Sequence, residues 1–155
     1  MKAIPIFALL ALLGCTRPGG GYSEIPKHHA TELLRAQHDD LTDWQLLTLA
    51  ICWTESKCNP AAVGNAGDRG ILQITPIYVA EVNRIAGTGY QPEDAHDTAA
   101  ALQMFDTLQA HYNPERDIET AIRYHNRGAA YRRAVLDNYE LLRRYEAARK
   151  AVTAK

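Results

Sequence analysis

Residues 42–56 read TDWQLLTLAICWTES, and this stretch decides the fold. It begins with a capping box, in which Thr42 is the N-cap residue and Gln45, three residues on, returns a side-chain hydrogen bond. The positions that follow are apolar almost all the way around a helix, which is typical of a helix that is buried on every side. We therefore predict a central buried helix that runs to about Ser56.

Glu55 stands out near the end of this helix. It lies four residues after Ile51 and eight after Leu47, so it shares the apolar face of the helix. Burial disfavours the charged form of a carboxylate, so an unpaired glutamate there should keep its proton near neutral pH. Such a group can donate a proton to the leaving-group oxygen of a glycosidic bond. The pattern alone leaves two alternatives open, a glutamate in solvent and one paired with an arginine.

The chain after this helix is predicted to turn and double back. Residues 61–70 (AAVGNAGDRG) contain three glycines and no helical periodicity, which is typical of a hairpin-like turn region. Residues 71–74 (ILQI) are expected to form a short buried strand or extended piece. Thr75 followed by Pro76 is an N-cap with proline at the first helical position, so the next helix should run to about Ala86.

Apolar periodicity and capping residues predict four further helices. They span residues 28–38, 98–112, 118–125 and 130–151, and Asp97 and Asp117 cap the second and the third of them. The predicted fold class is therefore mainly α, with some α+β character. It consists of a helical domain around the buried helix that carries Glu55, with a small hairpin lobe.

Composition and charge exclude several classes of protein. The chain has 155 residues, of which 46% are hydrophobic and 23% charged, too apolar for a disordered chain and about the length of one domain. The formal net charge is -1, which argues against nucleic acid as a partner. The balance is uneven along the chain. Residues 15–112 hold 6 basic and 12 acidic side chains, whereas residues 113–155 hold 10 basic and 6 acidic ones.

The N-terminus has the pattern of an export signal. Residues 1–14 consist of a short positive start, an apolar run of about 11 residues, and a glycine directly before Cys15. This pattern resembles the bacterial lipobox, in which the cysteine is lipidated and becomes the new N-terminus. An ordinary cleaved signal with an incidental cysteine is the alternative. Residues 15–27 are then expected to be a flexible tether, and residues 28–155 the functional domain.

Cys52 and Cys58 remain in the exported domain. Export would place them in an oxidising compartment, where they can form a disulfide. Residues six apart in one unbroken helix are about 9 Å apart, too far to bridge, so a disulfide requires the helix to end between them. Two buried thiols are the alternative.

Three motifs follow one another between residues 42 and 128. The first is TESKCNPAAV (54–63), the second GDRGILQITP (67–76), and the third IRYHNRG (122–128). Together they resemble the motifs of the soluble lytic transglycosylase family, which contain Glu-Ser, Asn-Pro, Gly-x-x-Gly, Gln-Ile-x-Pro and Asn-x-Gly in this order. The sequence departs from the family at His125, where the family usually has tyrosine, although Tyr124 stands just before it.

The resemblance implies a lysozyme-like fold and a substrate, peptidoglycan, whose glycan strands alternate N-acetylglucosamine and N-acetylmuramic acid. It implies that Glu55 is the sole catalytic acid and base. Glu55 would protonate the glycosidic oxygen and then take a proton from the 6-hydroxyl of muramic acid, so that a 1,6-anhydro sugar forms and no water is consumed. The family needs no metal and no organic cofactor.

The resemblance also implies a set of substrate-binding residues around Glu55. Tyr124 or His125, together with Asn126, would orient the carboxylate of Glu55. Two purely structural alternatives remain. Gln73 could instead form a hydrogen bond to the hairpin backbone, and Asn126 could serve only to end a helix. The implied set comprises Ser56, Gln73, Ile74, Tyr124, His125 and Asn126.

Asp68 leaves a second reaction open. A hydrolase that cleaves the same bond needs a second carboxylate to activate water. The segment Gly67–Gly70 also resembles goose-type lysozymes, and a hairpin could bring Asp68 across the cleft to Glu55. The alternatives are an Asp68 that merely pairs with Arg69 at the surface, and a protein that binds the cell wall without catalysis.

The same features define the expected surroundings of the protein. We expect a monomer in the bacterial cell envelope, anchored through lipid on Cys15, facing the periplasm and held at the outer membrane. Glycan strands would be its substrate, and a cell-envelope or secretion-machine protein could be a partner. The basic residues of the final helix are expected either to face solvent or to contact such a partner.

Overall fold

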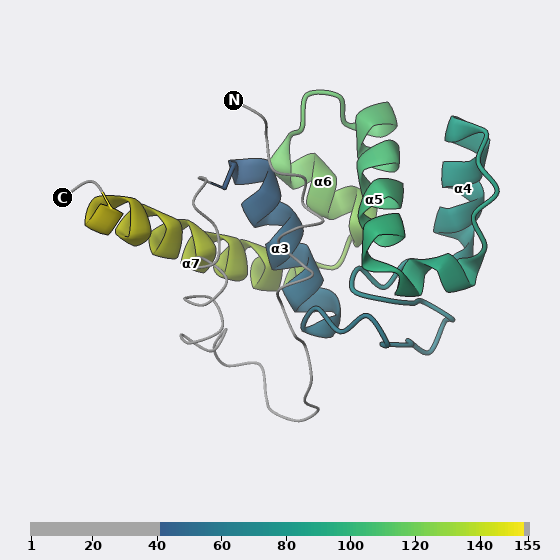
Figure 1. Ribbon diagram of the computed structural model, residues 1–155, viewed down its shortest axis with the longest axis horizontal. Helices are drawn as coiled ribbons and strands as arrows, with labels where there is room; N and C mark the ends of the chain where they lie inside the picture. Colours follow the sequence, from purple (N-terminus) through teal and green to yellow (C-terminus); the bar gives the residue numbers. More distant parts are fainter. Residues whose placement is uncertain (1–40, 154–155) are drawn as a thin grey trace.

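The computed structural model describes residues 41–153, and this part of the chain contains six helical segments (Figure 1). The predicted signal 1–14, the lipidation site Cys15, the tether 15–27 and the predicted helix 28–38 lie outside the described residues. The segments are α3 (Asp43–Ser56), α4 (Pro76–Ala86), the 3-10 helix η1 (Pro92–His96), α5 (Thr98–Tyr112), α6 (Ile118–His125) and α7 (Ala129–Thr153).

Helix α3 lies at the centre of the fold, as predicted. Its capping box is present, because the N–H of Thr42 donates to Gln45 Oε1 at 2.8 Å and the N–H of Gln45 donates to Thr42 Oγ1 at 3.3 Å. The helix ends at Ser56, and Lys57 follows in the left-handed conformation with φ 57°. About two turns of α3, from Leu46 to Cys52, are buried without interruption.

Helix α7 packs along α3 and extends beyond it (Figure 1). Polar contacts fix the two helices at both ends of their common length. Asn138 Nδ2 donates to Thr54 Oγ1 at 3.0 Å, and Arg143 lies 3.6 Å from Asp43. Periodicity predicts an apolar face of α7 that consists of Val135, Tyr139, Leu142 and Tyr145. The first three are buried in the core and Tyr145 packs against it, which confirms this face.

The core lies between α3, α5, α7 and the segment that follows α3. Periodicity predicts a buried stripe on α5, and all of its members are buried, namely Ala101, Leu102, Phe105, Leu108 and Gln109. The burial of Met104 was not predicted. The 3-10 helix η1 was not predicted either. The largest side chains with almost no exposed surface are Phe105, Leu47, Ile51, Ile71, Leu72, Ile74, Leu102, Met104 and Ile122.

Residues 57–75 form the hairpin lobe, and this region differs from the prediction. Residues 71–73 form turns rather than a strand, and the lobe is held by two isolated antiparallel bridges, Val63 to Arg69 and Arg69 to Ile74. The glycine at position 70 makes the reversal possible with φ 74°, and its Cα approaches the carbonyl oxygen of Ala95 in η1 so closely that no side chain fits. The lobe is therefore docked on η1.

The two cysteines of the described chain are both buried and are not joined in a disulfide. The helix does end between them, at Ser56, but the alternative of two buried thiols is the one observed.

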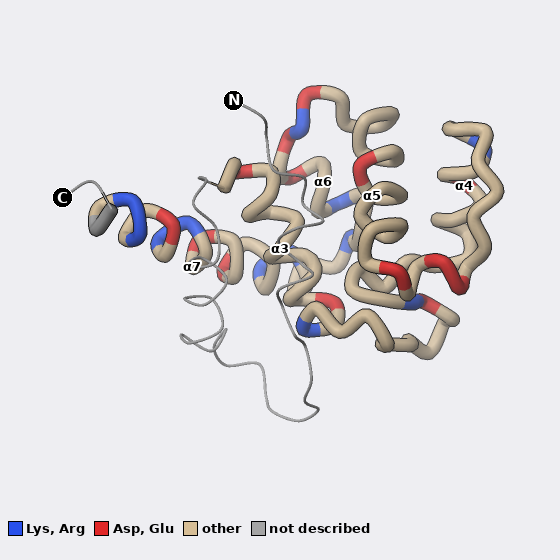
Figure 2. The backbone as a smooth tube through the Cα atoms, in the orientation of Figure 1, with Lys and Arg blue, Asp and Glu red and all other residues tan. Residues whose placement is uncertain are grey.

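The uneven charge along the chain becomes an uneven distribution in space. Basic side chains are spread along α7, whereas acidic ones gather around η1 and the start of α5 (Figure 2). Between residues 41 and 153, none of the helices combines the length and the apolar character that a membrane span requires.

Candidate active site

Glu55 occupies the last turn of α3, where the helix meets the hairpin lobe and the end of α6. Its side chain is 17% exposed, so the carboxylate is partly covered and still open to a ligand. Oε1 of Glu55 lies 3.2 Å from Nε2 of His125. The contact differs from the unpaired and arginine-paired carboxylates considered from the pattern alone, because α6 brings His125, one of the candidates for orienting Glu55, against it from 70 residues further along the chain.

His125 is the last residue of α6, and its ring is 5% exposed. Its Nε2 lies 2.9 Å from the carbonyl oxygen of Leu72 as well as 3.2 Å from Glu55. A carbonyl oxygen only accepts hydrogen bonds, so Nε2 carries a hydrogen and donates it to Leu72, while a carboxylate oxygen of Glu55 lies 3.2 Å from the same nitrogen. Nε2 of His125 thus lies where α3, α6 and the hairpin lobe meet.

Three aromatic rings surround His125. The rings of Tyr78 and Phe105 meet it edge-on at 6.2 and 6.1 Å between centroids, and the ring of Tyr131 lies nearly parallel to it at 6.2 Å. Within the described part of the chain, the only buried side-chain nitrogen or oxygen atoms that lack a hydrogen bond are His125 Nδ1 and the hydroxyls of Tyr78 and Tyr131. The polar atoms without partners are thus concentrated around the residue that faces Glu55.

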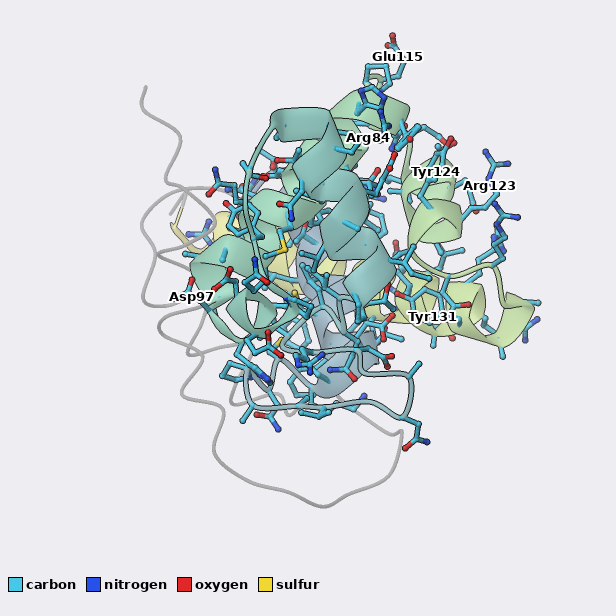
Figure 3. All side chains as sticks on the ribbon, turned by 90° about the vertical axis from the view of Figure 1, so that its right-hand side faces the viewer. Arg84, Asp97, Glu115, Arg123, Tyr124 and Tyr131 are labelled. Carbon is cyan, nitrogen blue, oxygen red and sulfur yellow. The ribbon has the colours of Figure 1, made fainter. Side chains whose placement is uncertain are left out.

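Tyr131 belongs to this site although the sequence reasoning did not place it there. Burial raises the pKa of Tyr131 far above its usual range, and the nearby negative charge of Glu55 adds to this effect. The hydroxyl therefore stays protonated and lies close enough to Glu55 to feel its charge. The residue stands in the first turn of α7, six positions after His125 (Figure 3). Apolar periodicity does not reveal such a role, since a tyrosine at this position also suits the core.

The three predicted residues that follow Glu55 in the chain build the wall of the site. Ser56 donates its hydroxyl to the carbonyl of Ile71 at 2.9 Å and accepts the N–H of Asn59, so it braces the hairpin lobe. Gln73 adopts φ 48° and donates Nε2 to the carbonyl of Gly70 at 2.9 Å. Ile74 is buried in the core, so its side chain is not available to a ligand, contrary to the prediction.

Asp68 does not pair with its neighbour. Arg69 instead forms an ion pair with Glu93 of η1 at 3.2 Å and donates to the carbonyl of Gly67. The Asp68 carboxylate packs over Gly64, where a Cβ atom would lie 1.9 Å from its Oδ2. Among the described residues this carboxylate has neither a hydrogen bond nor an ion pair.

The other two predicted residues of the third motif point away from Glu55. Tyr124 is exposed and stacks on Tyr112 of α5 with 5.4 Å between ring centroids. Asn126 accepts the N–H of Gly128 at 2.8 Å, which fixes the turn between α6 and α7. Of the candidates for orienting Glu55, the structure brings only His125 into contact with it. Across residues 41–153, no three His, Cys, Asp or Glu side chains are grouped as a metal ion requires.

The domain is mostly helical with almost no strand among the described residues, which is consistent with the mainly α fold of lysozyme-like proteins. Residues 32–147 match the family model of the transglycosylase SLT domain, and the chain belongs to this family. Its function is thus of the lytic transglycosylase type, directed at the glycan strands of peptidoglycan. No curated protein and no solved structure matches the chain.

Proposed function

We propose that this protein cleaves the β-1,4 bond between N-acetylmuramic acid and N-acetylglucosamine in peptidoglycan, with Glu55 as its only acid and base. The observation that carries the proposal is the position of Glu55. Its carboxylate is largely covered but still 17% exposed at the end of a buried helix, and its Oε1 lies 3.2 Å from Nε2 of His125. This environment suits a group that must both give and take a proton.

The reaction has two steps, and its atoms balance without water. Protonated Glu55 gives its proton to the glycosidic oxygen, the bond from that oxygen to C1 of muramic acid breaks, and positive charge develops at C1. The Glu55 carboxylate then removes the proton from the 6-hydroxyl of the same sugar while that oxygen bonds to C1. The product is a 1,6-anhydro ring, and Glu55 is protonated again for the next turnover.

His125 and Tyr131 support both states of Glu55. The Nε2–H group of His125 is held by the carbonyl of Leu72, so it stays in place while the carboxylate gains and loses its proton. When Glu55 is ionised, the Nε2 of His125 lies 3.2 Å from its carboxylate, and the Tyr131 hydroxyl is close enough to feel its negative charge. Both therefore position Glu55 rather than contact the sugar.

Hydrolysis is the second candidate, and one observation favours it. Asp68 is a partly exposed carboxylate on the hairpin lobe without a partner among the described residues. A carboxylate in this state could activate water once a substrate has filled the space between it and Glu55. The products separate the two reactions, since only hydrolysis leaves reducing ends.

The test is product analysis with a Glu55→Gln variant. We expect wild-type protein to release fragments with 1,6-anhydromuramic ends from purified cell-wall sacculi, as measured by mass spectrometry. Glu55→Gln should lower the rate about 10²- to 10⁴-fold, because the amide cannot donate or accept the proton. Glu115→Gln is the matched control, since Glu115 is exposed on the connection between α5 and α6 (Figure 3).

Two results would contradict the proposal. Reducing ends in place of anhydro ends, lost on Asp68→Asn, would establish the hydrolase. Equal clearing of sacculi by wild type and Glu55→Gln would exclude Glu55 as the acid and would leave a protein that binds the cell wall by other means.

We further propose that the domain works in the cell envelope on a lipid anchor at Cys15, facing the periplasm at the outer membrane. The N-terminal pattern of residues 1–15 supports this location. Membrane fractionation tests it, because Cys15→Ala should move the protein from the membrane to the soluble fraction. A cell-envelope or secretion-machine partner remains part of the proposal.

A further inference from the structure

Two tyrosines form an exposed stack at the ends of α5 and α6. Tyr112 is 37% exposed and Tyr124 is 42% exposed, and their rings lie at 25° to each other with 5.4 Å between centroids. His111 meets Tyr112 edge-on at 4.6 Å. These two tyrosines are among the few large hydrophobic side chains in the described part of the chain that remain exposed, so a stacked pair of them calls for an explanation.

Charged groups of α4 hold this stack in place. The hydroxyl of Tyr112 donates to Glu81 and accepts from Arg84 Nη2 at 3.2 Å, while Arg84 also binds both carboxylate oxygens of Glu81 at 2.7 and 2.8 Å. The hydrogen bonds from Arg84 and Tyr112 lower the pKa of Glu81 to about 2, so its charge persists over the ordinary pH range. The stack is thus fixed before any ligand arrives.

Polar groups around the stack remain available. Nη1 of Arg84 has no hydrogen bond to any residue in the described range, and the side chain of Arg84 is exposed. The Tyr124 hydroxyl likewise has no partner there. A flat apolar surface therefore lies beside free donors, which is the combination that small polar ligands with one apolar face require.

The stack and the contact to Glu55 share the last turn of α6. Tyr124 directly precedes His125, whose Nε2 lies 3.2 Å from Glu55, and the Tyr124 ring packs on Tyr112 instead. Figure 3 shows Tyr124 beside Arg84, with Tyr131 of α7 further along the same side of the molecule. A glycan strand that passes Glu55 and continues around the end of α6 would reach this surface.

We propose that Tyr112 and Tyr124 form a sugar-binding subsite for a pyranose ring of the glycan strand, outside the bond that is cleaved. The C–H groups of a pyranose face would pack on the Tyr124 ring, and Arg84 Nη1 would donate to a hydroxyl or acetamido oxygen. Because the stack is already fixed, little ordering accompanies binding. The identity of the strand rests on the proposed function, but the binding surface itself does not depend on catalysis.

Binding measured without turnover tests the subsite. In the full chain with Glu55→Gln, we would measure the Kd for insoluble sacculi by sedimentation and for soluble glycan strands by calorimetry. Adding Tyr124→Ala should weaken binding about tenfold, which corresponds to about 1.4 kcal/mol. Tyr124→Phe keeps the ring and should bind within about twofold of its parent, which is a difference of about 0.4 kcal/mol.

A purely structural role of the stack would give a different result. Tyr112→Phe keeps the ring but removes the hydroxyl that binds Glu81 and Arg84, so it tests the brace between α4 and α5 alone. The proposal is overturned if Tyr124→Ala binds like its parent, or if Tm and binding fall together in both Tyr124→Ala and Tyr112→Phe.

The two proposals can fail separately. If wild-type protein releases no anhydro ends while the Glu55→Gln parent still binds sacculi through Tyr124, the proposed reaction is wrong and the subsite stands. If anhydro ends form and Tyr124→Ala leaves binding unchanged, the subsite is wrong and the reaction stands. A parent that binds no glycan at all overturns the subsite as well.

Discussion

His125 places an imidazole N–H against the carboxylate of Glu55, at a position where the family motif usually has a tyrosine hydroxyl. Both groups can donate one hydrogen bond. The imidazole also has a second contact, because its Nε2 lies 2.9 Å from the carbonyl oxygen of Leu72. The donor is therefore fixed by the hairpin lobe as well as by α6, and the lobe is coupled directly to the position of the catalytic carboxylate.

His125→Ala should separate positioning from binding. Hydrogen bonds to charged groups contribute about 1.5–3 kcal/mol, so we expect kcat to fall about 10- to 100-fold. KM should change little, because the ring is 5% exposed and does not reach the substrate. Steady-state kinetics on soluble glycan strands measures both constants.

His125→Tyr is the matching variant, since it restores the donor of the family motif. It should retain more of kcat than His125→Ala does. Equal kcat values for the two variants, or a rise in KM as large as the fall in kcat, would show that His125 does not position Glu55.

The sequence predicted Glu55 itself and left its partner undecided, and the reason is physical. Glu55 shares a helix face with Leu47 and Ile51, which is a local property that periodicity reveals. Its contact with His125 spans 70 residues and depends on how α6 packs. The exposed Tyr124 and the buried His125 are neighbours in the chain, and only the packing of α6 decides which of them faces inward.

At the scale of elements, prediction succeeded wherever a helix end carries its own signal. The caps Thr42, Thr75, Asp97 and Asp117 each accept a hydrogen bond from the first turn of the helix that they begin, so those four helices start where they were predicted. Residues 71–74 have strand-like composition, but 71–73 form turns and only Ile74 makes a bridge, because the short lobe must wrap around the end of α3 and dock on η1.

Gly70→Ala tests that docking. A Cβ at this position would lie 1.8 Å from the carbonyl oxygen of Ala95, and the residue has φ 74°. The left-handed conformation costs about 1–2 kcal/mol for alanine, and forcing an atom into packed backbone adds about 1–3 kcal/mol.

Gly87→Ala is the control, because Gly87 has φ 65° and open space around it, so only the conformational cost applies. Urea denaturation of both variants should show Gly70→Ala as the less stable, and equal free energies of unfolding would mean that the lobe is not held against η1.

For the whole molecule, the basic and acidic parts of the chain are joined by α7 lying along α3. Most ion pairs of α7 are exposed, as between Glu140 and Arg144. Glu146 is different, because its carboxylate is buried, binds Arg149 at 2.7 Å and accepts the N–H of Leu41 just before α3 at 3.1 Å. Glu146 lies four residues after Leu142 and seven after Tyr139, so it continues the apolar stripe of α7. Periodicity does not predict a buried charge there, because the N–H of Leu41 that the carboxylate accepts comes from another part of the chain.

Glu146→Gln and Glu140→Gln form a matched pair on this helix. The Glu146 side chain is 4% exposed and that of Glu140 is 50% exposed, while both bind arginine. Removing one charge from a buried pair leaves the other poorly solvated, so Glu146→Gln should lower the free energy of unfolding by about 3 kcal/mol. Exposed pairs contribute about 0–1 kcal/mol, so Glu140→Gln should change the free energy of unfolding little.

Urea denaturation at two salt concentrations measures the free energy of unfolding of both variants. Only the small effect of Glu140→Gln should shrink at high salt, because screening acts mainly on exposed charges. If both variants lower the free energy of unfolding by the same small amount, the junction of α7 with the start of α3 does not depend on the buried carboxylate. Apolar contacts along the two helices would then hold them together.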